Sequence, residues 1–136
     1  MPTRDEICLR AMAQADVPLG MRLSGEAGWN QTPDDWQRLL ALAGDGAWVA
    51  ECGGTPVGTT LICRFGTVAW VAMVLVDETF RGRGIGRALV ERAIAFADAG
   101  GVTSLWLDAT EAGRGLYEAL LCGGPERCMA EKGLKT

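Results

Sequence analysis

The residues best suited to chemistry in this sequence of 136 residues lie in one short basic stretch. Within residues 77–87, three arginines are interleaved with three glycines: Arg81, Gly82, Arg83, Gly84, Gly86 and Arg87. An apolar run, Val68–Val76, precedes the stretch, and an amphipathic pattern, Ile85–Ala99, follows it. A strand, a glycine-rich turn and a helix start together form an anion site, because the first helical turn has unpaired N–H groups and a partial positive charge. Glycines let the backbone approach a phosphate closely, and arginines add full charges that suit its oxygens.

Two common phosphate-binding motifs do not fit this stretch. A Walker A loop ends in Gly-Lys-Ser/Thr, and no lysine lies nearby. The dinucleotide fingerprint G-x-G-x-x-G would need a glycine in place of Arg87 or Leu89, and it belongs near the first strand of a parallel sheet. The pattern that remains is R-x-x-G-x-G, from Arg81 to Gly86. The alternative interpretation is a set of solvated surface arginines, but solubility alone does not explain their alternation with glycines at a helix start.

Composition and charge limit the classes of function. One domain is expected, with 49% hydrophobic and 22% charged residues, as in ordinary globular proteins. The net charge of −4 argues against a broad nucleic-acid or anionic-membrane surface, although the arginine cluster still suits a phosphorylated small molecule. Val68–Val76 is too short to span a bilayer, and the charged N-terminus does not resemble a signal peptide. These features favour the cytoplasm and predict neither a nucleic-acid nor a membrane partner.

Metal and histidine chemistry are not expected. The sequence has five cysteines without a C-x-x-C pair and no histidine, which argues against zinc. The missing histidine also excludes a Cys–His or Ser–His catalytic pair. The cysteines are interpreted as small hydrophobes in a reducing compartment.

A strand and two helices are predicted at the start of the chain. Residues 7–12 alternate loosely as a first strand, and Asp16 can cap a short helix that runs to Leu23. Thr32 then caps a second helix, with a proline and two aspartates in its first turn, and Gly44 ends it.

The rest of the pattern predicts an α+β fold with one mixed sheet. The remaining predicted elements are three strands, a helix, a strand and a short helix, at residues 47–51, 57–65, 67–76, 85–99, 102–107 and 114–121. Short links between the first three strands imply an antiparallel meander, and the helix then forms a right-handed crossover to a parallel strand. Because Val68–Val76 barely alternates, this strand is expected to be buried on both faces.

The order of these motifs resembles the GCN5-related N-acetyltransferase (GNAT) superfamily. The resemblance rests on R-x-x-G-x-G at residues 81–86, on the Val-Leu-Val strand end at residues 74–76, and on Leu-Tyr-Glu-x-Leu at residues 116–120. It implies the acyl-CoA N-acyltransferase fold, with α/β/α layers, in a domain at residues 1–121. An atypical tail, residues 122–136, stands where the usual last strands would be.

The resemblance also implies acetyl-CoA as the co-substrate, without a metal. It places the pyrophosphate over the N–H groups of residues 82–87 and the pantetheine along the backbone of residues 74–76. The sheet is expected to splay between the strands at residues 67–76 and 102–107. The predicted cofactor-binding residues are therefore Val74, Leu75, Val76, Arg81, Gly82, Arg83, Gly84, Ile85, Gly86 and Arg87.

Two catalytic residues follow from the resemblance. Tyr117, the only tyrosine, lies where the family has its thiolate-protonating tyrosine; otherwise it is a core residue. Its reference pKa of about 10 against about 8.5 for a thiol makes proton donation near-balanced. Asp108 resembles the position of a catalytic glutamate in ribosomal-protein alanine acetyltransferases, and a turn or capping role explains it equally well. A backbone N–H of Leu75 or Val76 is expected to hold the oxyanion. The other candidates for the base are Glu26, Glu51, Glu78 and a chain of waters.

The amine acceptor is expected to lie against the variable N-terminal part. Residues 24–31 contain two glycines and are predicted to form a loop that carries Trp29 and Asn30. Trp29 either anchors the loop by packing or lines a pocket with Asn30. A chain of net charge −4 suits a cationic acceptor, so the expected substrate is a primary amine of a small molecule or peptide.

The C-terminal sequence departs from the family pattern and leaves two functions open. After Leu120 there is no Gly-Phe, and too few residues remain for the usual hairpin. Either the strand at residues 102–107 presents an edge that a homodimer covers, or the C-terminus is truncated or read in another frame. The first function is an N-acetyltransferase that works by direct attack of the amine. The alternative is a catalytically weak or inactive acyl-CoA-binding or regulatory module on the same fold. A nucleotide-binding module outside the family is disfavoured by the failed motif tests.

Overall fold

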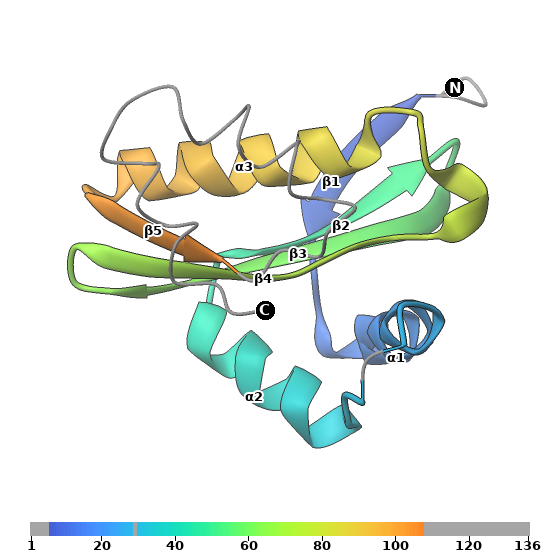
Figure 1. The fold of residues 1–136 in the computed structure, drawn as a ribbon, viewed down its shortest axis with the longest axis horizontal. Coiled ribbons are helices and arrows are strands. Elements are labelled where there is room, and N and C mark those ends of the chain that lie inside the picture. The colour runs from blue at the N-terminus through green and yellow to red at the C-terminus, as the bar shows by residue number, and fades with distance from the viewer. Residues whose placement is uncertain (1–5, 29, 108–136) are drawn as a thin grey trace.

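The computed structural model describes residues 6–28 and 30–107 (Figure 1). In this part, one sheet has the strand order β1-β2-β3-β4-β5; β1 to β4 are an antiparallel meander, and β5 is parallel to β4. The predicted α+β fold with a mixed sheet is therefore confirmed. The elements in chain order are β1 (Ile7–Ala11), the 3₁₀ turn η1 (Gln14–Asp16), α1 (Val17–Glu26), α2 (Pro33–Ala43), β2 (Ala47–Cys52), β3 (Thr55–Phe65), β4 (Val68–Val76), the 3₁₀ turn η2 (Glu78–Phe80), α3 (Ile85–Ala99) and β5 (Ser104–Leu107).

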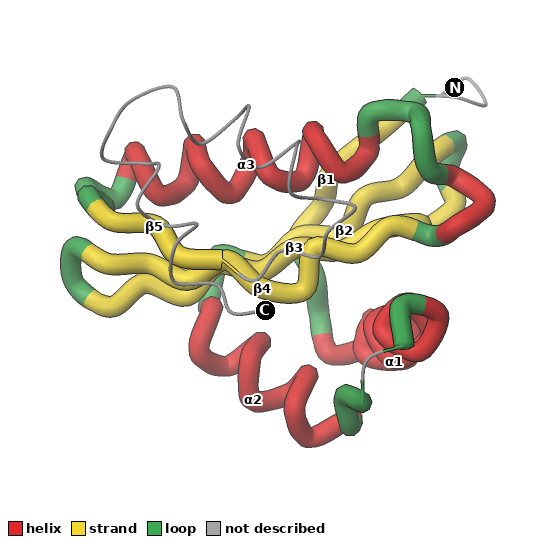
Figure 2. The backbone as a smooth tube through the Cα atoms, in the orientation of Figure 1, coloured by secondary structure: helices red, strands yellow, loops and turns green. Residues whose placement is uncertain are grey.

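The helices lie on both faces of the sheet, with α3 on one face and α1 and α2 on the other (Figures 1 and 2). The α3 face follows from helical spacing, because Leu89, Ala93 and Ala97 recur at every fourth position and are all buried. Ala93 and Ala97 pack with Ile62 and Val71 of the sheet, and Leu89 packs with Val57. The crossover helix is thereby fixed over the strands that precede and follow it.

The opposite face is closed by Trp36, which is fully buried. Its ring lies against the backbone of Gly20 on α1, where a Cβ would come within 2.7 Å of the ring. Thr32 caps α2 as predicted, and it forms a reciprocal capping box with Asp35: the Thr32 hydroxyl accepts from the Asp35 N–H at 3.1 Å, and the Asp35 carboxylate accepts from the Thr32 N–H at 2.9 Å. This cap fixes the start of α2 so that Trp36 points at α1 and the sheet.

Two expectations for the first helix are wrong. The helix α1 continues to Glu26, so the predicted loop begins three residues later than residue 24. Ser24 is buried in the helix, where its hydroxyl donates to the carbonyl of Gly20 at 2.9 Å and so finds a local partner. Asp16 does occupy the N-cap position, but its side chain makes no capping bond. The carboxylate instead accepts from the Arg10 guanidinium at 2.9 and 3.0 Å.

The expected burial of β4 on both faces is also wrong for the first four residues of the strand. Ala69 and Val71 are buried under α3, whereas Val68 and Trp70 on the other face are each 37% exposed. Trp70 stacks on Trp106 of β5, with 6.2 Å between ring centroids and 6° between the planes. A neighbouring ring, not a helix, therefore covers part of this apolar face. Among the described residues no strand pairs with the outer edge of β5, and the homodimer stays a prediction.

Candidate functional site

A glycine turn, residues 81–84, joins the end of β4 and η2 to α3. Gly82 and Gly84 have φ of +82° and +84°, a region that other L-residues enter at a cost of about 1–2 kcal/mol. A Cβ at either position would meet nothing within 4 Å, so the space over the turn is open. Gly84 is the N-cap of α3 and brings no capping side chain, which leaves the first N–H groups of a helix of 15 residues available. The turn has the geometry of an anion cradle.

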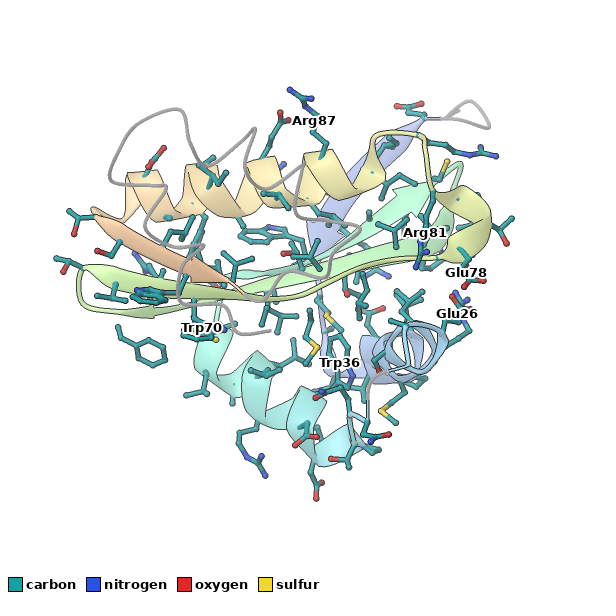
Figure 3. The ribbon with its side chains drawn as sticks, in the orientation of Figure 1. Glu26, Trp36, Trp70, Glu78, Arg81 and Arg87 are labelled. Atoms are coloured by element: carbon teal, nitrogen blue, oxygen red, sulfur yellow. The ribbon has the colours of Figure 1, made fainter. Side chains whose placement is uncertain are left out.

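The three arginines of this stretch lie in different places (Figure 3). Arg81 lies beside the end of β4, where its Nε donates to the Val76 carbonyl at 3.4 Å. The Arg83 guanidinium lies over the Phe80 ring, 5.1 Å from its centroid. Arg87 extends from the outer side of α3, and its Nε donates to Glu91 at 3.1 Å. Arg81 and Arg83 flank the turn directly, whereas part of the Arg87 charge is compensated by a carboxylate one helical turn away.

Some predicted cofactor-binding residues have buried side chains. Ile85 is 1% exposed and packs with Leu89 and Val57 in the core, and Leu75 is buried on the other face of the sheet. Only the backbone of these residues is available to a ligand. The buried Ile85 also anchors the start of α3, so the N–H groups of its first turn are held in place.

The strand β5 pairs with only the first part of β4, and the rest of that edge of β4 has no neighbouring strand in the described part of the chain. Val68–Val71 of β4 pair with Ser104–Leu107 of β5, in parallel. Residues 72–76 continue past this pairing and pair with β3; on their other side no strand of the described residues pairs with them, and we call this side the open edge of β4. It leads directly into the glycine turn.

A β-bulge interrupts β4 where the open edge begins. Thr59 pairs with Leu75 and Leu61 with Ala72, so two residues of β4, Met73 and Val74, stand opposite Thr60. Met73 has a φ of +56° and is the only non-glycine residue of the described chain with a positive φ. A methionine in this region is strained, and such strain is found where a site needs a particular backbone direction.

Backbone alternation then determines which amide faces the open edge. The Asp77 N–H donates to the Val57 carbonyl on β3 at 2.8 Å, so this opposing pair is hydrogen-bonded. In an antiparallel ladder the adjacent pair, Gly58 and Val76, is not bonded, and its amides point outward. The Val76 carbonyl is correspondingly available to Arg81. Alternation thus directs the N–H of Val76, rather than that of Leu75, to the open edge.

An ion pair joins α1 to the start of the turn. Arg22 of α1 donates to Asp77 at 2.8 Å and to Glu26 at 2.9 Å, and the other Asp77 oxygen accepts from the Thr79 N–H at 2.9 Å. The hydrogen bond from Arg22 lowers the pKa of Asp77 below its ordinary value of 3.8. Asp77 therefore links α1 and η2 while it is ionised.

This link predicts a pH dependence. A carboxyl group whose folded-state pKa is lowered stabilises the fold above its unfolded pKa and loses that contribution as the pH falls through the folded value. Asp77→Asn is expected to lower the free energy of unfolding by up to about 1 kcal/mol near neutral pH. The difference from wild type should begin to shrink as the pH falls below 3.8 and should continue to shrink as the pH approaches the lower pKa of the folded state. Urea unfolding between pH 7 and pH 3 measures it.

A control for this prediction is Asp45→Asn, which removes the same charge from an exposed turn after α2. It should change the free energy of unfolding little at any pH in that range. An Asp77→Asn penalty of constant size from pH 7 to pH 3 would contradict the role of the ionised carboxylate.

The candidate bases among the described residues lie at different distances from the open edge of β4. Glu51 is on β2, two strands from β4, and pairs with Arg10 at 2.7 Å, so it lies away from the open edge. Glu26, at the end of α1, pairs with Arg22, and Glu78 is exposed in η2, on the same side of the molecule (Figure 3). Asn30 is exposed between α1 and α2. Trp29, Asp108 and Tyr117 lie outside the described residues, as does the tail at residues 122–136.

Within the described residues, no cluster of three or more His, Cys, Asp and Glu side chains is arranged to hold a metal ion. None of the helices described there has the length and apolar character that crossing a membrane requires.

The bulge has a signal in the sequence: Val68–Val76 does not alternate regularly, a pattern that also predicts a strand buried on both faces. A one-residue insertion into the ladder also breaks the alternation, because the residues after it change face. The partners that hold the bulge and the turn, Thr59 and Arg22, lie 14 and 55 residues from Met73 and Asp77 and carry no local motif.

The fold also occurs in solved structures of other proteins. The structure of Ard1 from Thermoplasma volcanium matches with a TM-score of 0.76 and 22% identity, over 84% of this chain and 81% of that one. Rv2747 from Mycobacterium tuberculosis, solved in complex with CoA and NLQ, matches with a TM-score of 0.66 and 23% identity, over 79% and 70% of the two chains. At these identities the likeness establishes the fold.

The sequence itself identifies the family. Residues 19–121 match the model of the acetyltransferase (GNAT) family, and the chain belongs to that family. It is 30% identical over 98 residues to the uncharacterized N-acetyltransferase YitH of Bacillus subtilis (strain 168). That match covers 72% of this chain and 34% of the relative, so the chain spans about a third of the length of this curated relative.

Proposed function

We propose that this chain transfers the acetyl group of acetyl-CoA to a primary amine of a small molecule or peptide. The observation that carries the proposal is the uncapped start of α3, opened by two positive-φ glycines and joined to the open edge of β4. A pyrophosphate at the glycine turn and a pantetheine along the open edge would place the thioester near the bulge. Membership of the acetyltransferase family and the CoA complex of a protein with the same fold support acetyl-CoA as the donor.

The proposed reaction is a direct attack. The neutral amine nitrogen forms a bond to the acetyl carbonyl carbon, and the carbonyl oxygen takes up negative charge. The Val76 N–H on the open edge is aimed to donate to this oxygen. The carbon–sulfur bond then breaks, the amine proton passes to a base, and the thiolate receives a proton from Tyr117. The products are an N-acetyl amide and free CoA.

The remaining roles are part of the same proposal. Asp108 is proposed as the base, with Glu26 and Glu78 as alternatives on the described surface. Trp29 and Asn30 are proposed to line the acceptor side, since Asn30 is exposed in the loop that follows α1.

Two measurements test the proposed function in order. Calorimetric titration of the full chain with acetyl-CoA should show saturable binding, and a panel of primary amines should then release free CoA thiol. Absence of acetyl-CoA binding would defeat the proposal. Binding without turnover on any amine would favour the alternative, a non-catalytic acyl-CoA-binding module on the same fold.

Tyr117→Phe tests the proposed acid. Loss of the phenolic proton should lower turnover by about 100-fold or more, within the range of general acid catalysis, and leave the acetyl-CoA Kd within about twofold. Thiol release gives the turnover number and calorimetry the Kd. A turnover number equal to that of the wild type would remove Tyr117 from the mechanism.

A further inference from the structure

A side chain of the neighbouring strand forms a hydrogen bond to the bulge in β4. The Thr59 hydroxyl donates to the carbonyl of Met73 at 2.8 Å, and Thr59 is fully buried. Met73 is the strained residue, with a φ of +56°. Because this bond gives the carbonyl of the strained residue a partner, the hydroxyl stabilises the bulged conformation relative to a regular strand.

The position of the bulge connects it to the site. Without the bulge, every residue of β4 after Met73 would pair with β3 one position earlier. The N–H groups of these residues would then each point in the opposite direction within the sheet. The Val76 N–H would then point to β3 instead of the open edge. The bond from the Asp77 N–H to Val57 fixes the register on the far side of Val76, so Val76 lies between two fixed points.

We infer that Thr59 is a positioning residue for acetyl transfer, whose hydroxyl holds the Met73 bulge and thereby aims the Val76 N–H at the thioester carbonyl. The inference rests on the proposed function. Thr59 lies on the face of the sheet covered by α1 and α2 and does not itself border the open edge, so it acts through the backbone of β4. Its removal should impair turnover while the glycine turn, and with it the affinity for acetyl-CoA, stays intact.

The adjacent residue supplies a matched control. Thr60 is equally buried and stands opposite the bulge, but its hydroxyl has no hydrogen-bond partner in the described structure. Thr59→Val and Thr60→Val each replace a hydroxyl by a methyl group, at neighbouring positions of β3, and keep the β-branched shape. Thr59→Ser keeps the hydroxyl and is the conservative variant.

The experiment compares these three variants of the full chain by two readouts. The first is turnover from thiol release, together with the acetyl-CoA Kd from calorimetry. Thr59→Val should lower kcat about 10-fold to 100-fold, as a misaligned catalytic group does, and leave the Kd within about twofold. Thr59→Ser should keep most of the wild-type kcat, and Thr60→Val should match the wild type.

The second readout is the amide hydrogen-exchange rate of Leu75 by NMR, which needs no activity. By alternation the Leu75 N–H bonds to β3, so its exchange rate reports opening of the bulge, and Thr59→Val alone should raise this rate about tenfold.

An unchanged exchange rate in Thr59→Val would show that Thr59 does not stabilise the bulge. A raised rate with wild-type kcat, or equal losses of kcat in Thr59→Val and Thr60→Val, overturns the positioning role. A wild-type chain that neither binds acetyl-CoA nor releases thiol defeats the proposed function and the positioning role together, while Leu75 exchange still reports whether Thr59 holds the bulge.

Discussion

Replacement of Gly84 by alanine is expected to raise the Kd for acetyl-CoA about tenfold or more, which corresponds to about 1.4 kcal/mol of binding free energy. Gly84 holds a φ of +84° at the N-cap of α3, where a Cβ costs about 1–2 kcal/mol. The turn can relieve that strain only by moving the N–H groups that we propose to bind the pyrophosphate. The Cβ also projects into the open space over the turn. Calorimetric titration measures the change in Kd.

Gly66→Ala is the matched control for this prediction. Gly66 also has a positive φ, +67°, and open space around its missing Cβ, but it lies in the β3–β4 turn at the other end of β4 (Figure 1). Both variants should lose about 1–2 kcal/mol of folding stability, since both carry the same backbone strain. Only Gly84→Ala should lose affinity. Equal affinities in the two variants would refute the placement of the pyrophosphate at the glycine turn.

Trp36→Ala is expected to produce the largest loss of stability, about 3–5 kcal/mol in the free energy of unfolding. Trp36 is 0% exposed and joins α2 to α1 and to the sheet, in contact with the backbone of Gly20. Small domains have only about 5–15 kcal/mol of stability in total, so the variant should be close to its unfolding transition at room temperature. Urea titration followed by circular dichroism measures the loss.

Two further variants separate packing from other effects at this position. Leu42→Ala, on the same helix at a residue that is 54% exposed, should change the free energy of unfolding by no more than about 0.5 kcal/mol. Trp36→Phe should lose clearly less than Trp36→Ala, because the indole N–H has no hydrogen-bond partner in the described structure and none is broken. A Leu42→Ala loss as large as that of Trp36→Ala would show that α2 as a whole, rather than the buried ring, carries the stability.

The elements near strong local signals were predictable from sequence. Thr32 followed by Pro33 and two aspartates predicted the start of α2, because a cap and the first-turn residues that suit it lie within a few positions of one another. The buried spacing of α3 and the glycines before it likewise predicted a helix that begins at the basic turn. The end of α1 was missed because two glycines within residues 24–31 suggested a loop, whereas Leu23 packs in the core, Ser24 is buried and the helix continues to Glu26.

The sequence by itself determined the order of elements and the glycine turn, since both depend on residues within a few positions of one another. It also supplied the family, whose model covers residues 19–121. Only the tertiary structure decided which amide of β4 faces the open edge. That direction depends on a one-residue bulge at Met73, on the Thr59 hydroxyl that holds it, and on the bond between Asp77 and Val57. These partners are brought together by strand pairing across the sheet, and no pattern along the chain encodes the register at which they meet.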